Sequence, residues 1–127
     1  MKYLLDVNVL LAWHHGSHPH GARFHTWLAT VEPAELATCA VTELGFVRIS
    51  MGVFGYSRTD ALAALAAIKT SVGGFIGEMP PVVNLPTWVT RHDETTDGFL
   101  CTLAAKNGLR LATFDVRIKD PAVLVIP

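Results

Sequence analysis

The sequence predicts an α/β fold, in which helices cover both faces of a central parallel sheet to make a three-layer α/β/α sandwich. Short apolar runs that suit buried strands alternate with segments whose apolar residues recur at helical spacing. Parallel strands need crossover connections, and helices between strands provide them. The length of 127 residues is that of one ordinary domain. We therefore expect residues 1–127 to form a single domain.

Composition and charge limit the classes of function. Half of the residues are hydrophobic and the net charge is −1, so we expect a folded core and no broad basic surface for nucleic acid. No apolar stretch is long enough to span a membrane, and the start lacks the cleavage site of a signal peptide. Cys39 and Cys101 lie in apolar surroundings, which indicates buried thiols in a reducing compartment. We expect a cytoplasmic protein.

The first half of the chain predicts two strands and four helices, separated by a loop rich in Gly, Pro and His. The expected elements are a strand at 2–5, helices at 7–13 and 22–31, a strand at 35–39, a helix that places Glu43 in its first turn, and a helix at 57–69. Thr38 or Thr42 is expected to cap the helix that holds Glu43, and Leu44 and Phe46 to lie on its core face. Gly73 and Gly74 are expected to stop the helix that begins at Ser57.

The second half predicts three strands and one helix. Prolines keep the segment after Met79 extended, which allows a short third strand at 82–85. Thr96 is the expected cap of a helix that begins at Asp97 and stops at Asn107-Gly108. Apolar strands are expected at 110–114 and 122–126.

Four acidic residues are expected to meet at the carboxyl end of this sheet. Asp6 and Asp115 each follow a strand, while Glu43 and Asp97 lie in first turns of helices that start there. Carboxylates gathered at one site repel one another, and hard oxygen ligands favour Mg²⁺ or Mn²⁺. The sequence therefore predicts a divalent-metal site. The alternative for each acid is a helix cap or a turn, and Asp6 fits that alternative least because it interrupts an apolar run.

The segments that hold these acids resemble those of the PIN-domain nucleases, and more narrowly the VapC toxins of type II toxin–antitoxin systems. The resembling segments are Leu4-Leu5-Asp6-Val7-Asn8-Val9-Leu10-Leu11, Thr42-Glu43, Thr96-Asp97 and Leu111-Ala112-Thr113-Phe114-Asp115. The resemblance runs from Lys2 to the C-terminus. It implies a PIN-like fold and a Mg²⁺-dependent endoribonuclease, with Mn²⁺ as a substitute. It also implies an RNA substrate, a homodimer and a VapB-like antitoxin that silences the enzyme.

Carried over by position, the resemblance assigns a role to each acid. Asp6 and Asp97 would bind the metal directly, Glu43 directly or through water, and Asp115 would complete the site. Asn8 and Thr113 would orient these carboxylates, although a turn Asn and a strand Thr would also explain them. One departure is Gly98, where the family more often has Ala, at a cost of about 1 kcal/mol of helix stability.

The sequence does not decide whether several other residues contribute to the expected site. Asp93 and Glu94 lie close to Asp97 in the sequence, and Asp93 would share a helix face with it if the helix began earlier. The histidines from His14 to His25 lack the spacing of a structural zinc site and are expected in a loop and a helix start.

Two other classes of function remain open. The first is a phosphoryl-transfer or receiver-type domain, which would need a nucleophilic Asp and usually a Lys after a later strand. No Lys lies between Thr113 and Asp115. The second is an inert binding module whose acids receive a basic partner.

The apolar content of the chain predicts an interface. A domain of this size has a limited interior, so some large apolar side chains are expected on the monomer surface. The side chains considered are Trp13, Trp27, Phe46, Phe54 and Trp88. We expect them to support a homodimer.

Overall fold

The computed structural model describes all 127 residues and has a five-stranded sheet at its centre. The strands are β1 (Tyr3–Leu5), β2 (Leu36–Cys39), β3 (Gly74–Ile76), β4 (Arg110–Thr113) and β5 (Val123–Val125). Their order in space is β3-β2-β1-β4-β5 and every neighbouring pair is parallel. β1 and β4 are central neighbours, with Leu5 opposite Ala112. The residues that follow these two strands therefore emerge side by side.

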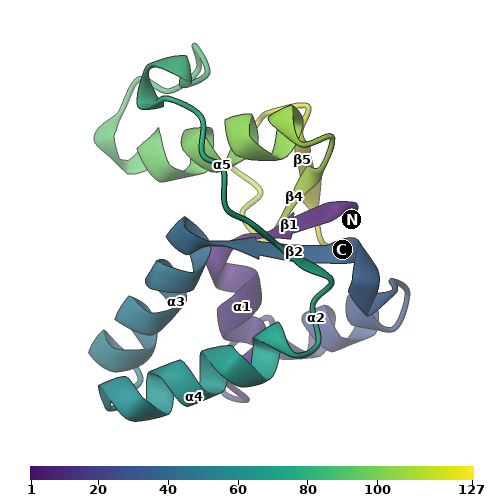
Figure 1. Cartoon of the computed structure of the whole chain (residues 1–127), viewed down its shortest axis with the longest axis vertical. Helices are drawn as coiled ribbons and strands as arrows, with labels where there is room; N and C mark the ends of the chain where they lie inside the picture. Colours follow the sequence, from purple (N-terminus) through teal and green to yellow (C-terminus); the bar gives the residue numbers. More distant parts are fainter.

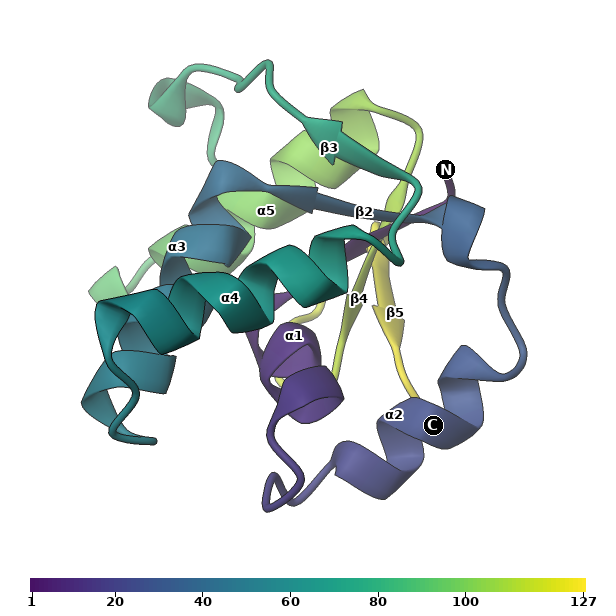
Figure 2. The same ribbon diagram turned by 60° about the horizontal axis from the view of Figure 1, so that its bottom comes forward.

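Helices cover both faces of the sheet, so the predicted PIN-like α/β/α sandwich is confirmed. The α-helices are α1 (Val7–His14), α2 (Gly21–Leu28), α3 (Ala40–Gly52), α4 (Arg58–Lys69) and α5 (Thr95–Lys106). The short 3₁₀ helices are η1 (Pro33–Glu35), η2 (Val82–Asn84) and η3 (His92–Glu94). Figure 1 shows α5 on one side of the sheet and α1, α3 and α4 on the other. Figure 2 shows β3 at the sheet edge beside β2.

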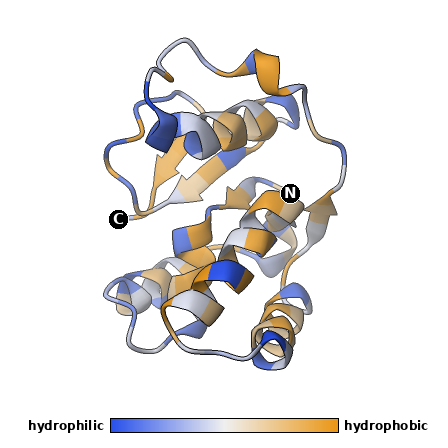
Figure 3. Cartoon of the chain, turned by 90° about the vertical axis from the view of Figure 1, so that its left-hand side faces the viewer, coloured by the Kyte–Doolittle hydropathy of each residue, from blue (hydrophilic) through white to orange (hydrophobic).

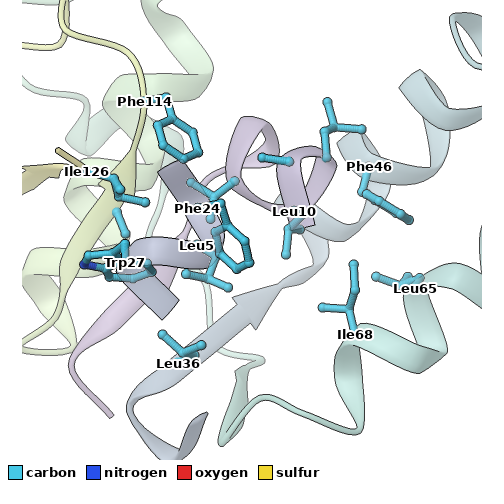
Figure 4. Packing of buried hydrophobic residues seen from close by; sticks show 14 of the residues in the cluster. Leu5, Leu10, Phe24, Trp27, Leu36, Phe46, Leu65, Ile68, Phe114 and Ile126 are labelled. Atoms are coloured by element: carbon cyan, nitrogen blue, oxygen red, sulfur yellow. The ribbon is translucent and has the colours of Figure 1, made fainter. Parts of the chain in front are cut away.

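The two faces of the sheet bury separate apolar clusters because strand side chains alternate between faces. Leu5 and Leu36 face the cluster shared with α1 to α4, in which Figure 4 shows Leu5 beside Phe24. The other face packs against α5. The main members of this second cluster are Leu4, Ala37, Ile76, Leu100, Leu103 and Leu111. Hydrophobic residues accordingly concentrate on the strands and on the inner helix faces in Figure 3.

The predicted strand at 82–85 is wrong, and the third strand in the chain is β3 instead. Residues Val82–Asn84 form a 3₁₀ turn, because Asn84 donates its backbone N–H to the carbonyl oxygen of Pro81 at 3.1 Å. Val82 and Val83 are exposed and so contribute nothing to a sheet core. Of the two glycines expected to stop a helix, Gly74 begins the strand and Gly73 directly precedes it. A Cβ on Gly73 would overlap the backbone of Ala34, so this close approach requires glycine.

Two helix starts differ from their predicted caps. α5 begins at Thr95 after the 3₁₀ turn η3, so Thr96 lies inside the helix rather than capping it. Cys39 is the N-cap of α3, and the hydroxyl of Thr42 accepts its backbone N–H at 3.3 Å. Asp97 and Glu43 nevertheless lie in first turns, as predicted.

The predicted distribution of apolar side chains is partly wrong. Trp27 and Phe46 are buried, whereas Leu44, which was expected in the core, is 69% exposed. Exposed aliphatic residues, rather than the aromatic residues, supply most of the apolar surface. Cys39 and Cys101 are buried and free, as predicted. None of the helices combines the length and the apolar character that crossing a membrane requires.

At Gly98 of α5, replacement by Ala has two opposing effects on stability, one from helix propensity and one from packing. Replacement by Ala favours the helix by about 1 kcal/mol. However, the new Cβ would overlap Cγ2 of the stiff, β-branched Val89 and approach Pro86 Cδ at 3.3 Å. We expect Gly98→Ala to lower the free energy of unfolding by about 1–3 kcal/mol, measured by urea denaturation.

The matched control is Gly52→Ala at the end of α3, where a Cβ would meet nothing within 4 Å. This variant should be as stable as the wild type or more stable. A gain in stability from Gly98→Ala would contradict the close packing of α5 on the segment that contains Pro86 and Val89.

Candidate active site

The first acid of the site, Asp6, directly follows β1 and is buried. Asp6 is the N-cap of α1 and is only 6% exposed. One carboxylate oxygen, Oδ1, accepts the backbone N–H of Val7 at 2.7 Å. The other, Oδ2, accepts the hydroxyl of Thr113 at 2.7 Å. Burial raises the pKa of Asp6, and these two hydrogen bonds oppose that rise.

Thr113, at the end of β4, joins Asp6 to Asp115. Its hydroxyl donates to Asp6 and accepts the backbone N–H of Asp115 at 3.1 Å. It also accepts the amide Nδ2 of Asn8 at 3.1 Å, while Oδ1 of Asn8 accepts the N–H of Phe114 at 3.2 Å. These hydrogen bonds use the full capacity of the hydroxyl. Asn8 and Thr113 therefore contact the acids in the manner expected of orienting groups.

Three of the four predicted acids come together at the carboxyl ends of β1 and β4. We call Asp6, Asp97 and Asp115 the acidic cluster. Desolvation, together with the negative charges of Asp6 and Asp115, raises the pKa of Asp97 to about 6. Asp115 adds to the pKa rise of Asp6 in turn. Like charges thus act on one another within the cluster.

Asp115 is held by a neighbouring arginine that sequence analysis did not single out. Arg117 donates Nε to Asp115 Oδ1 at 3.0 Å and Nη2 to Oδ2 at 2.9 Å. These hydrogen bonds hold the pKa of Asp115 below its usual range. The only sequence signal for this pair is that Arg117 follows Asp115 by two residues, and such a spacing is common on protein surfaces.

Glu43 does not join the other acids in this structure. Its Oε2 accepts the hydroxyl of Thr38 at 2.6 Å, and its Oε1 pairs with Lys69 at 3.2 Å. The groups whose charges act on Asp97 are Asp6, Asp115, Asp93 and Arg117, and Glu43 is absent from them. Lys69 comes from the end of α4, and its contact with Glu43 leaves no local signal in the sequence.

Asp93 and Glu94 lie beside the cluster without belonging to it. A cavity of about 210 Å³ is lined by both residues, together with Trp88, Arg91, Asp97, Asp115, Arg117 and Ile118. Asp93 pairs with Arg91 at 2.8 Å. Glu94 accepts the backbone N–H groups of Thr90 and Arg91, which closes the turn before α5.

The donor chemistry of the acidic cluster suits a hard divalent cation. Carboxylate oxygens are the ligands that Mg²⁺ and Mn²⁺ prefer, and a cation would remove the repulsion that raises the pKa of Asp97. As the side chains stand, no three acidic, His or Cys residues are close enough together to hold a metal ion. Arg117 engages both oxygens of Asp115, and Lys69 engages Glu43.

The histidines pack rather than gather at the acids. The ring of His15 is buried, stacks on Phe54 at 3.7 Å and pairs through Nε2 with the hydroxyl of Ser50 at 2.9 Å. His20 stacks on Phe114 at 4.6 Å between centroids. The geometry thus gives these two histidines structural contacts.

Asp6 fits poorly as the nucleophile of a receiver-type domain. Its oxygens accept hydrogen bonds from Val7 and Thr113, and no lysine pairs with the carboxylate. A receiver-type domain usually needs a lysine beside the nucleophilic Asp. Hydrolysis at the rim of the sheet, next to Asp97 and Asp115, agrees better with this geometry.

The parallel sheet and its covering helices define the class of PIN-like α/β/α domains, and comparisons with known proteins give the family. No protein-family model matches the chain. Ribonuclease VapC39 of Mycobacterium tuberculosis is 38% identical over 96% of this chain and 94% of its own length. Ribonuclease VapC38 of the same species is 37% identical over 91% of this chain and 86% of its own. The chain belongs to the VapC family of ribonucleases.

A solved structure agrees with the fold. Mycobacterium tuberculosis VapC20, described as a sarcin–ricin loop cleaving toxin, matches with a TM-score of 0.68 over 95% of this chain and 92% of its own. The sequences are 16% identical, so this likeness supports the fold alone.

The raised pKa of Asp97 makes a prediction about stability. Its carboxyl group has a pKa of about 6 in the folded protein, against 3.8 in an unfolded chain. The folded state therefore binds more protons between about pH 4 and pH 6, and this group lowers the free energy of unfolding as the pH rises through that window. In EDTA, Asp97→Asn should be more stable than the wild type at pH 7, and the difference should disappear near pH 4.

Thermal unfolding of both proteins between pH 4 and pH 7.5 measures this difference. Asp60→Asn in the first turn of α4 is the control, because it removes an acid without relieving the acidic cluster and should give no gain. Equal stability of Asp97→Asn and the wild type at pH 7 would show that the carboxylates do not repel one another as described.

Proposed function

We propose that this chain is an endoribonuclease toxin that hydrolyses RNA phosphodiester bonds with a divalent metal, Mg²⁺ or Mn²⁺, at the acidic cluster. The observation that carries the proposal is the placement of Asp6, Asp97 and Asp115 at the carboxyl ends of β1 and β4, where Asp97 and Asp115 line one cavity and the charges of Asp6 and Asp115 raise the pKa of Asp97. Membership in the VapC family of ribonucleases supports the same activity. Residues 1–127 would work as one nuclease domain in the cytoplasm, which agrees with the free, buried thiols.

In this mechanism Asp6, Asp97 and Asp115 would hold the metal, which would supply an activated water and neutralise charge at the scissile phosphate. Asp6 is fixed by its two hydrogen bonds, and its burial prevents it from turning away. Asp115 is freed when Arg117 leaves it for the phosphate, since a guanidinium fork binds either group. Glu43, once released by Lys69, would assist directly or through water.

Asp6→Asn and Asp97→Asn should each lower the rate of Mg²⁺-dependent RNA cleavage by about 100-fold or more, because each removes a negative ligand. The assay uses total cellular RNA with Mg²⁺ or with EDTA, and the RNA ends are sequenced. Product ends should be 5′-phosphate and 3′-hydroxyl, as expected for attack by water.

Asp60→Asn again serves as the matched control and should cleave RNA at the wild-type rate. Undiminished cleavage by either cluster variant, or activity that persists in EDTA, would overturn the proposed site. Products with 2′,3′-cyclic phosphate ends would overturn the proposed chemistry.

We also propose a homodimer that forms through an exposed apolar surface. We call this surface the α3/η2 face: Val41 and Leu44 on α3, Val82 and Val83 on η2, with Leu85 and Phe99 beside them. Val83 is 85% exposed, and a groove of about 300 Å³ lies between Val41, Val82 and Phe99. Apolar side chains at such a density on a surface are typical of interfaces.

Leu44→Glu and Val83→Glu should each convert the dimer to a monomer, measured by light scattering at micromolar concentration, because an unpaired charge would be buried at the interface. Leu62→Glu on α4 is the control, since Leu62 is exposed and lies outside the α3/η2 face. A monomeric wild-type protein, or dimeric variants, would exclude this interface.

A VapB-like antitoxin is the proposed regulator. The cavity beside the acidic cluster carries four carboxylates, and Arg117 already demonstrates that an arginine fork fits Asp115. An arginine from the antitoxin would compete with metal and phosphate for these acids. We expect the product of a neighbouring reading frame to copurify and to suppress cleavage, with less inhibition when its arginine is changed. Full cleavage by the saturated complex would exclude blockage of the active site.

A further inference from the structure

One aromatic residue lies in the wall of the cavity that contains Asp97 and Asp115. Trp88 lines this space of about 210 Å³ together with Arg91, Arg117 and several carboxylates. It is half-buried, since it also packs against the apolar cluster under α5. The cavity is therefore continuous with the acidic cluster and combines an aromatic wall, cationic groups and potential metal ligands.

Trp88 is anchored at one point. Its indole Nε1 donates a hydrogen bond to Oδ2 of Asp120 at 2.8 Å. Asp120 is itself fixed, because its Oδ1 accepts the backbone N–H of Ala122 at 2.8 Å just before β5. An aromatic side chain held in this way loses little conformational entropy when a ligand stacks on it. If Trp88 only stabilised the segment before α5, its ring would not need to line a polar cavity.

The charges around the ring suit a nucleotide. Arg91 and Arg117 are exposed, and each forms two hydrogen bonds to a neighbouring carboxylate. Guanidinium forks of this kind bind phosphate with the same geometry. RNA is recognised largely through unstacked bases that lie on aromatic side chains. A phosphate near Arg117 would thus bring an adjoining base within the part of the cavity that Trp88 lines.

We propose that Trp88 is the stacking surface for one nucleobase of the RNA next to the scissile phosphate. The inference rests on the proposed ribonuclease activity and adds a specificity-determining residue to it. Trp88 selects RNA whose base at this position is free to leave its own stack, such as a base in a loop. Stem regions, whose bases remain stacked, bind less well at the same cavity.

The test compares two small probes, 5′-AMP and ribose 5-phosphate, in the presence of Mg²⁺. Both carry the phosphate, and only 5′-AMP carries a base. The indole N–H resonance of Trp88, assigned by its loss in Trp88→Phe, reports stacking directly in a ¹H–¹⁵N spectrum. We expect 5′-AMP to shift this resonance and to bind about tenfold more tightly than ribose 5-phosphate, as base–aromatic stacking predicts.

Variants separate stacking from structural support. Trp88→Leu should lose the preference for 5′-AMP while its affinity for ribose 5-phosphate stays unchanged, and Trp88→Phe should retain most of the preference. Phe75→Leu is the matched control, because Phe75 is an exposed aromatic residue on the edge strand β3. Amide spectra show whether each variant is folded.

Equal binding of the two probes to the wild type would overturn the proposal, as would a wild-type preference for 5′-AMP in a folded Trp88→Leu. RNA cleavage by the wild type is measured separately. RNA cleavage by the wild type together with equal binding of the two probes would leave the proposed function standing and remove only the stacking surface. Absence of cleavage would instead remove the proposed function.

Discussion

The hydroxyl of Thr113 is the contact on which the site depends. Asp6, Asp97 and Asp115 repel one another, yet the fold keeps them together where β1 and β4 end side by side. The hydroxyl donates to Asp6 and accepts the backbone N–H of Asp115, so it ties two central strands together through their acids. Asp6 is further fixed as the N-cap of α1. The free energy cost of the repulsion is therefore offset by hydrogen bonds and by the burial of two apolar clusters around them.

Two basic side chains of the same chain form ion pairs with acids at this end of the sheet. Arg117 neutralises Asp115, and Lys69 neutralises Glu43 from the end of α4. Both pairs are partly exposed, so they are weak enough to be exchanged for other partners. Under the proposed function, the same carboxylates would bind an arginine of this chain, an arginine of an inhibitor or a metal ion with its phosphate. In this account the competition among these cations for one set of acids determines whether the nuclease is active.

Much of the fold, and the placement of three of the four acids at one end of the sheet, could be predicted because both depend on local patterns. Asp6 and Asp115 follow apolar strands, and the helix that contains Asp97 has clear apolar spacing. The strand at 82–85 was wrong because β-branched residues favour strands, whereas the adjacent prolines and full exposure favour a turn. Contacts between distant segments, such as Lys69 with Glu43 and Trp88 with Asp120, leave no periodic signal in the sequence. Gly98 lowers the helix propensity of α5, and propensity alone does not reveal that its missing Cβ permits the close contact with Val89.

Mn²⁺ affinity in Thr113 variants tests the central claim most directly. Thr113→Val keeps the shape of the side chain but removes the hydroxyl, which leaves Asp6 Oδ2 buried without its partner. Thr113→Ser keeps the hydroxyl and serves as the control. We expect Thr113→Val to lose about 1–3 kcal/mol of stability in EDTA and to bind Mn²⁺ at least about tenfold more weakly by calorimetry, with Thr113→Ser close to the wild type. Wild-type stability and wild-type Mn²⁺ affinity in Thr113→Val would contradict the claim that this hydroxyl holds the acids in place.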